Sequence, residues 1–101
     1  MVDRDALIAA IEHHHVVTLR YGRRLEPRRV LPHVLYLTAT GRPMLDAYQL
    51  SGPTTSGPLP GWREFALERI VRLEVLDERF LPVPDYQPES ERYAHGVVAM
   101  A

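Results

Sequence analysis

The chain contains no cysteine and no lysine. The lack of cysteine excludes disulfide bonds, thiolate zinc sites and thiol nucleophiles, so packing and hydrogen bonds must stabilise the fold. The chain also lacks an uninterrupted apolar run near the ~18 residues that a membrane-spanning helix needs, and its first residues are polar and acidic. We therefore predict a cytoplasmic protein that does not contact a membrane.

Charge is balanced overall but unevenly distributed. The formal net charge of −1 argues against a protein that coats nucleic acid through bulk electrostatics. The acidic excess lies in the later part of the chain, whereas five arginines gather early, at Arg20, Arg23, Arg24, Arg28 and Arg29. The planar guanidinium of arginine suits bidentate recognition of phosphate, although a uniform preference for arginine over lysine also arises from genome composition.

Hydrophobic periodicity predicts one helix followed by strands. Asp3 can accept hydrogen bonds from the first turn of a helix over 4–13, and from Val16 the period changes to two. The pattern predicts strands over 17–21, 28–38, 44–50, 62–67 and 70–76. Pro32 lacks a ladder donor and so implies an edge or a bulge in the second strand. The segment 51–61, with three glycines and three prolines, is predicted to be a loop.

These elements indicate one small domain. With 101 residues, 46% of them hydrophobic, the chain can bury a single core. A helix and five short antiparallel strands favour a mostly β fold that closes into a small barrel or bends strongly. We expect the domain to span 1–80, followed by a proline-rich tail over 81–101 that wraps the domain or is disordered and ends in a short helical turn.

An ordered set of motifs resembles the WYL domain family. The resemblance covers about 6–80 and rests on the helix Ile8 to Ile11, Leu19-x-Tyr21, Arg28-x-Val30-x-Pro32, Leu35, Leu45-x-Ala47-Tyr48, Arg63-x-Phe65-x-x-x-Arg69-Ile70 and Asp77-Glu78-x-Phe80. The Trp-Tyr-Leu triplet that names the family corresponds here to Pro43-Met44-Leu45, so only the leucine is kept. The resemblance implies an N-terminal helix and a five-stranded Sm-like or SH3-like barrel.

The resemblance also implies a function. WYL domains are generally non-catalytic sensing modules that recognise nucleotides or nucleic acid and act on an attached DNA-binding domain. A chain of this length would need a DNA-binding partner protein to regulate transcription. The missing Trp-Tyr pair removes aromatic side chains that line the ligand site in the family.

The candidate ligand-binding residues combine arginines with possible hydrogen-bonding and stacking groups. An even spacing places Arg63 and Arg69 on one face of a strand with Phe65 and Leu67, and such a face suits a phosphate and a base. Their alternative roles are structural: Phe65 in the core, and one arginine in a surface ion pair with Glu64 or Glu68. The predicted ligand set is Arg28, His33, Tyr48, Arg63 and Arg69. Tyr21 and Tyr48 fit a pocket rim or a core equally well, and a surface position is the alternative for His33.

Other functions are less well supported by the sequence. His13, His14 and His15 point about 100° apart on a helix and cannot converge on one ion, so we expect them at the helix C-terminus and predict no metal or cofactor. No nucleophile lies in a recognisable catalytic frame, and we predict no enzyme activity. The second hypothesis is a protein-interaction module that forms a homo-oligomer through its strand edges or the apolar segment Val97-Val98-Ala99-Met100.

Overall fold

The computed structural model describes residues 2–55 and 57–101. It contains one α-helix, α1 (Arg4–Glu12), and six strands. The strands are β1 (His15–Tyr21), β2 (Arg28–Leu37), β3 (Pro43–Ser51), β4 (Gly61–Ala66), β5 (Ile70–Arg79) and β6 (Val97–Met100). Short 3-10 turns lie at η1 (Leu67–Arg69) and η2 (Glu91–Tyr93).

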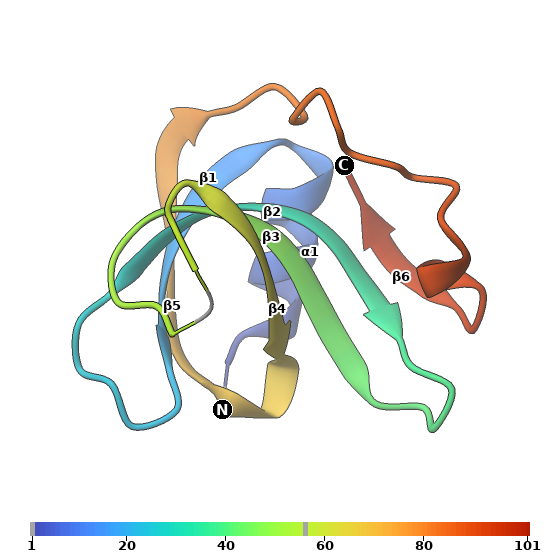
Figure 1. Cartoon of the computed structure of the whole chain (residues 1–101), viewed down its shortest axis with the longest axis horizontal. Helices are drawn as coiled ribbons and strands as arrows, with labels where there is room; N and C mark the ends of the chain where they lie inside the picture. The colour runs from blue at the N-terminus through green and yellow to red at the C-terminus, as the bar shows by residue number, and fades with distance from the viewer. Residues whose placement is uncertain (1, 56) are drawn as a thin grey trace.

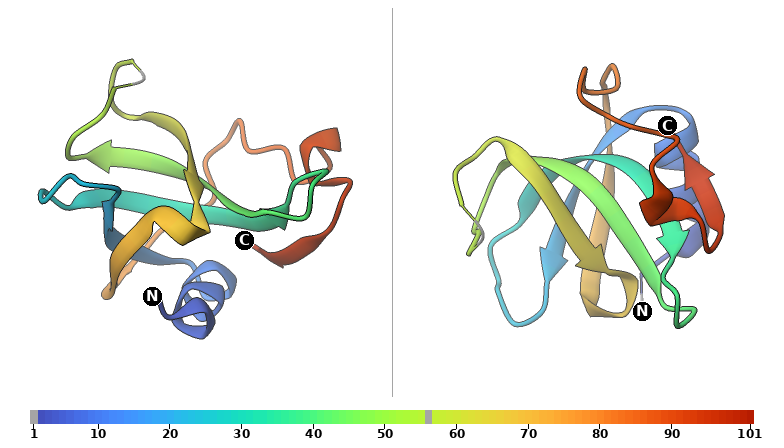
Figure 2. Two further views of the ribbon diagram at one scale, coloured as in Figure 1. Left: turned by 90° about the horizontal axis from the view of Figure 1, so that it is seen from below. Right: turned by 45° about the vertical axis from the view of Figure 1, so that its right-hand side comes forward.

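The strands form one strongly curved antiparallel sheet, with α1 covering one side of it (Figures 1 and 2). The strand order is β4-β3-β2-β1-β5, and β6 joins the sheet by pairing with β2. This arrangement confirms a mostly β fold with an N-terminal helix. The predicted strand number of five was wrong, because a sixth strand forms in the C-terminal segment.

The helix begins and ends for local reasons. The Asp3 side chain accepts a hydrogen bond from the Ala6 amide at 3.0 Å and so caps the first turn. At the other end His14 adopts φ 59°, a left-handed conformation that terminates the helix and turns the chain into β1. Leu7, Ala10 and Ile11 lie on the helix face that is buried against the sheet.

Strand β2 changes partners at its middle. Its first part pairs with β1 through Arg28 to Val30, and its second part pairs with β6 through Val34 to Tyr36. A register irregularity between Pro32 and Val34 separates the two parts, which confirms the bulge that Pro32 predicts. One strand therefore supports both the N-terminal and the C-terminal parts of the sheet.

The core lies between α1 and the concave face of the sheet. Its members come from the helix and from every strand, and Phe65 is one of its largest fully buried side chains. The core interpretation of Phe65 is thus confirmed. Ala99 of β6 also belongs to this core, so the C-terminal segment packs with the barrel instead of lying apart from it.

Candidate ligand-binding site

Arg28 lies in the interior, at the end of the barrel near the β1–β2 turn. It is paired with Leu19 across the sheet, so its side chain projects to the same face as the core residues of β1. Only 9% of Arg28 is exposed, and its guanidinium carbon lies 5.4 Å from the ring centroids of both Tyr21 and Phe65. Two aromatic rings thus replace part of the water that a guanidinium normally contacts.

The hydrogen bonding of Arg28 is incomplete. Its Nη1 donates to Gln49 Oε1 at a long 3.4 Å, and its buried Nε has no hydrogen-bond partner among residues 2–55 and 57–101. Burial lowers the pKa of Arg28, and the nearby charges of Arg24, Arg63 and Arg69 lower it further. The site therefore concentrates positive charge in a partly dehydrated place.

Arg69 approaches the same aromatic ring from η1. Its guanidinium carbon lies 4.8 Å from the Tyr21 centroid, while the Tyr21 hydroxyl accepts a hydrogen bond from the Ala66 amide at 2.9 Å. The Gly22 amide donates to the Arg69 carbonyl at 2.9 Å. Gly22 has φ +62°, a conformation that favours glycine, and a Cβ there would lie 2.8 Å from Arg69 Nη2, so a side chain at this position would displace the tip of Arg69.

Arg63 holds the loop between β3 and β4. Its Nε donates to Thr54 Oγ1 at 2.9 Å, and its Nη2 donates to the carbonyls of Gly57 and Pro58 at 3.0 and 2.9 Å. Its Nη1 donates to the Trp62 carbonyl at 2.7 Å. These acceptors are neutral, so they position the guanidinium without cancelling its charge.

We define these three side chains, Arg28, Arg63 and Arg69, as the arginine cluster; Arg28 and Arg69 also contact the Tyr21 ring. Across the described ranges, no carboxylate forms an ion pair with any of the three. The carboxylates bind other arginines, in the pairs Arg24–Glu26, Arg29–Glu78, Arg42–Glu68, Arg72–Glu74, Arg92–Asp46 and Arg92–Glu64. The alternative role for one of these arginines, an ion pair of Arg63 or Arg69 with Glu64 or Glu68, was therefore wrong.

The elements that carry Arg63 and Arg69 differ from the prediction. Strand β4 ends at Ala66, and Leu67 and Arg69 belong to the 3-10 turn η1, so Arg63 and Arg69 do not share one face of one strand. Arg63 lies in β4 and Arg69 lies in the corner between β4 and β5, and the charges of both act on Arg28. Tyr21, which sequence reasoning left open as core or rim, is the ring that contacts two of the arginines.

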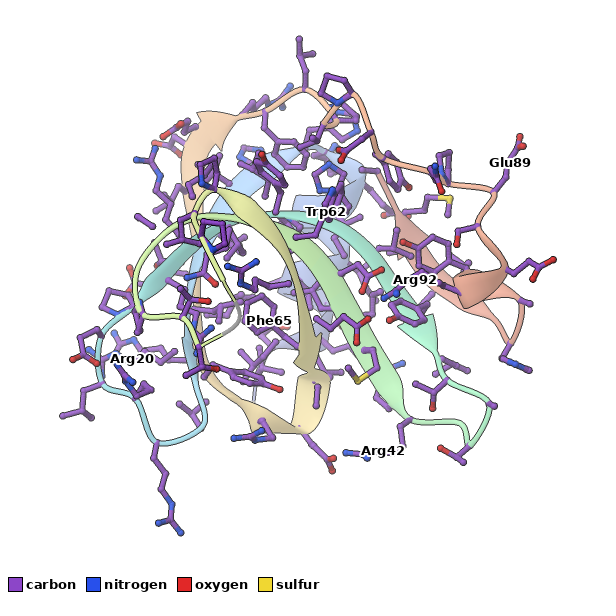
Figure 3. All side chains as sticks on the ribbon, viewed as in Figure 1. Arg20, Arg42, Trp62, Phe65, Glu89 and Arg92 are labelled. Carbon is purple, nitrogen blue, oxygen red and sulfur yellow. The ribbon has the colours of Figure 1, made fainter. Side chains whose placement is uncertain are left out.

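His33 and Tyr48 lie elsewhere, in a second aromatic group with Trp62. Tyr48 is opposite Trp62 in the β3–β4 pairing, whereas Arg63 is opposite Ala47, so Tyr48 and Arg63 project from opposite faces of the sheet. The rings of Tyr48 and Trp62 meet edge to face at 5.5 Å, and His33 meets Trp62 at 4.7 Å. Figure 3 labels Trp62 and Phe65, which mark the two sides of β4.

His33 is fully buried, so the alternative of a surface position was wrong. Its Nδ1 donates to the Leu31 carbonyl at 2.8 Å, and its Nε2 accepts from the Val83 amide at 3.1 Å. Burial is the main cause of its lowered pKa. Both ring nitrogens are engaged within the chain, and the neutral ring ties the C-terminal segment to β2.

A groove of about 720 Å³ lies between the outer face of β3 and β4 and the C-terminal segment, lined in part by Trp62, Glu64, Asp85, Tyr86 and Arg92. Asp46 at its base is buried and accepts hydrogen bonds from Tyr36 Oη at 3.0 Å and Tyr93 Oη at 2.8 Å. Burial and the Asp46 charge raise the pKa of Tyr36 to about 12. These polar groups of the groove thus hydrogen-bond to one another and hold the segment 81–101 against the sheet.

Arg92 also holds this segment against the sheet (Figure 3). Its guanidinium donates to both oxygens of Asp46, at 3.1 and 3.3 Å, and also bonds Glu64 and the Tyr36 hydroxyl. The bond to Glu64 is the main reason that the pKa of Arg92 is raised. Sequence reasoning missed this network because its members are far apart in the chain.

The histidine triplet is divided among three different environments. His13 caps the helix through its backbone, the His14 ring lies 5.5 Å from that of Phe80, and His15 Nδ1 lies 2.7 Å from the Leu76 carbonyl oxygen. Within residues 2–55 and 57–101 no three histidine or acidic side chains form a group that could hold a metal ion.

Comparison with known proteins gives one relative of known structure to report. No family model and no curated protein matches the chain. The chain is similar to proteasome accessory factor B/C (PafBC) of Arthrobacter aurescens. The similarity has a TM-score of 0.66 with 26% sequence identity over 83% of this chain. It covers 13% of PafBC, so this chain spans a small part of that protein's length.

The match to PafBC supports the WYL-like relationship that the motifs indicate. It covers most of the fold that carries the arginine cluster. In the part of the chain that the structure describes, no helix is both long enough and apolar enough to cross a membrane.

Proposed function

We propose that this chain is a non-catalytic, ligand-sensing WYL-like domain that binds a phosphate-bearing ligand, a nucleotide or a short single-stranded nucleic acid, and acts with a DNA-binding partner protein in transcription regulation. The regulatory part of the proposal is supported by the similarity to PafBC, a WYL-domain-containing transcription regulator. The ligand part rests on the arginine cluster.

The observation that carries the proposal is a buried arginine that no carboxylate neutralises. Arg28 has a buried Nε without a partner in the described ranges, and two further arginines add positive charge around it. A phosphate oxygen would supply the missing acceptor and the missing negative charge, through charge-assisted hydrogen bonds. Tyr21 offers an aromatic ring in contact with Arg28 and Arg69, and because this ring already contacts two guanidinium groups, the proposal rests on phosphate recognition.

The proposed ligand set is therefore Arg28, Arg63 and Arg69 with Tyr21. His33 is left out because its ring is neutral and both ring nitrogens have partners within the chain, whereas Arg63 keeps its positive charge beside neutral acceptors. Tyr48 is left out because it projects from the face opposite Arg63. A ligand at the arginine cluster would meet the loop that Arg63 holds, which gives the domain a surface segment able to respond to binding.

The first test is binding of a fluorescent single-stranded oligonucleotide, followed by anisotropy at two salt concentrations. The wild-type affinity should fall steeply as salt rises, because phosphate contacts release counterions. Arg69 is exposed, so Arg69→Ala should weaken binding about tenfold without unfolding the domain, and should reduce the salt slope by about 0.7.

Arg42→Ala is the matched control. Arg42 is also an exposed arginine, but it lies in the turn between β2 and β3, outside the arginine cluster, and Glu68 neutralises its charge (Figure 3). It should leave binding nearly unchanged. Absence of salt-dependent binding by the wild-type domain, both to the oligonucleotide and to a mononucleotide, or equal losses in the two variants, would contradict the proposal.

A further inference from the structure

Strand β5 leaves one edge of the sheet open. It is the last strand in the order β4-β3-β2-β1-β5, pairs with β1 on one side, and has no described strand on the other. Val71 and Val75 are 58% and 44% exposed, and they are two of the few large apolar side chains with such exposure. An open edge that carries exposed valines presents both unpaired backbone groups and apolar surface.

The regular part of this edge is short and electrically balanced. Irregularities in the β1–β5 register leave Arg72 to Val75 as the continuous ladder, opposite Leu19 and its neighbours. Arg72 and Glu74 are both exposed and lie 3.3 Å apart at Nη2 and Oε1. They alternate with Leu73 and Val75, so the charges project from one face of the strand and the apolar side chains from the other.

The cross-strand neighbours on β1 do not complement the charges on this face of β5. Arg72 lies opposite Arg20 of β1, and Glu74 lies opposite Thr18. Like charges directly opposite each other destabilise a sheet. Within the chain, the carboxylate of Glu74 pairs with Arg72, and the cross-strand neighbour of Arg72 is a second arginine, Arg20.

We propose that β5 pairs antiparallel with β5 of a second copy of this chain, in the register centred on Leu73. In this register Arg72 lies opposite Glu74 of the partner, Glu74 lies opposite the partner's Arg72, and the two Leu73 residues lie opposite each other, all within the regular ladder. The twofold symmetry gives the same contacts twice. The result is an alternating ladder of four charges on one face and the two Leu73 side chains, with Val75 of each copy beside them, on the other.

Neighbouring registers do not have this complementarity. A shift of the symmetry centre to Glu74 would place the two Glu74 carboxylates opposite each other, and a centre at Arg72 would do the same to the two guanidinium groups. A centre between Leu73 and Glu74 would place charged residues opposite apolar ones. The charge pattern thus selects a second copy of β5 as partner and selects the register as well.

The other segment considered for assembly is already occupied. Val97 to Met100 form β6, which pairs with β2 in the same chain and buries Ala99 in the core. Of the two strands that end the order, β4 and β5, β5 is the one that combines exposed valines with the Arg72–Glu74 pair. A ladder this short forms a weak dimer, at the low end of interface size, whose population rises with protein concentration.

Sedimentation velocity of the full chain, from micromolar to millimolar concentration, tests this inference. The wild-type chain should show a concentration-dependent dimer. Arg72→Glu places two carboxylates opposite each other at both symmetry-related contacts, and should raise the dimer dissociation constant at least about tenfold. The double variant Arg72→Glu with Glu74→Arg exchanges the charges and should restore dimerisation.

Arg4→Glu is the control, because Arg4 is an exposed arginine on α1, outside the β5 edge. It should dimerise as the wild type does, and circular dichroism should show all variants folded. A monomer at every concentration would overturn the inference. A dimer that survives Arg72→Glu, or a folded double variant that stays monomeric, would also overturn it.

Discussion

His33 is held neutral in the folded chain by the groups around its ring. Nε2 must be unprotonated to accept the Val83 amide, and burial lowers the pKa of His33 from its usual 6.5. The Leu31 carbonyl and the charges of Asp46 and Asp85 oppose this lowering, while His14 adds to it. When His33 is protonated, Nε2 can no longer accept the hydrogen bond from the Val83 amide, one of the links between the C-terminal segment and β2.

Stability should therefore decrease in mild acid. The folded pKa is below the unfolded one, so the contribution of His33 is fully present above about pH 6.5 and is lost as pH falls through the folded pKa. Urea unfolding at a series of pH values should show that His33→Gln removes part of the decrease between about pH 7 and pH 5. His13→Gln, at an exposed position, should keep the wild-type slope. If both variants show equal slopes, His33 does not control this decrease.

At the scale of elements, the β1–β2 turn and the β3–β4 loop lie side by side at the end of the barrel that holds the arginine cluster (Figures 1 and 2). Gly52 makes this approach possible. It has φ +102°, and a Cβ there would lie 2.5 Å from the Pro27 carbonyl oxygen and 2.8 Å from the Arg28 Cα. Both of these are backbone atoms, so they cannot move aside as a side-chain tip can.

Gly52→Ala should lower the free energy of unfolding by about 2 kcal/mol more than Gly41→Ala, as measured by chemical denaturation. Gly41 is the matched control, because it also has a positive φ, +81°, but a Cβ there meets nothing within 4 Å. Gly52→Ala should also weaken oligonucleotide binding, since it displaces the backbone of Arg28. Equal losses of stability in the two variants would mean that φ alone, and not the close approach, sets the cost.

Local patterns predict most of these elements. The capped amphipathic helix, the strands with period two, the Pro32 bulge and the glycine- and proline-rich loop can all be predicted because each depends on residues close in sequence. The sixth strand cannot be predicted in this way. Val97 to Met100 are too few to show a period, three prolines precede them, and their partner in β2 is more than 60 residues away.

The candidate site is likewise predictable only in part from local sequence. Arg28, Arg63 and Arg69 could be named from motifs, but the 3-10 corner that brings Arg69 to Tyr21 depends on where β4 ends, which is a tertiary property. The predicted placement of His33 at the surface was wrong because its burial depends on a contact with Val83, fifty residues later. Nothing within a short window of sequence distinguishes a buried histidine from an exposed one.

At the scale of the whole molecule, stability should be distributed unevenly. Strands β2 and β3 share a long ladder and a short connection. Strand β6 has only a short ladder, with a strand more than 60 residues earlier in the chain. Amide hydrogen exchange should therefore be slowest in the central β2–β3 ladder and faster in β6. Mass spectrometry of peptides over 30–36 and 97–101 measures this directly. Equal protection in both peptides would mean that β6 opens only when the whole domain unfolds.

The change of partners along β2 also orders the assembly of the chain in time. On the edge where the first half of β2 pairs with β1, the second half pairs with β6. This second half therefore has no strand partner on that edge until the C-terminal residues have been synthesised, although β1 to β5 can already pair with one another. Once the helix and the first five strands are assembled, the final step is the closure of the segment 80–96, which lets β6 reach β2. A newly made chain should pass through a stage in which the helix and the first five strands are assembled and the last strand still searches for its place.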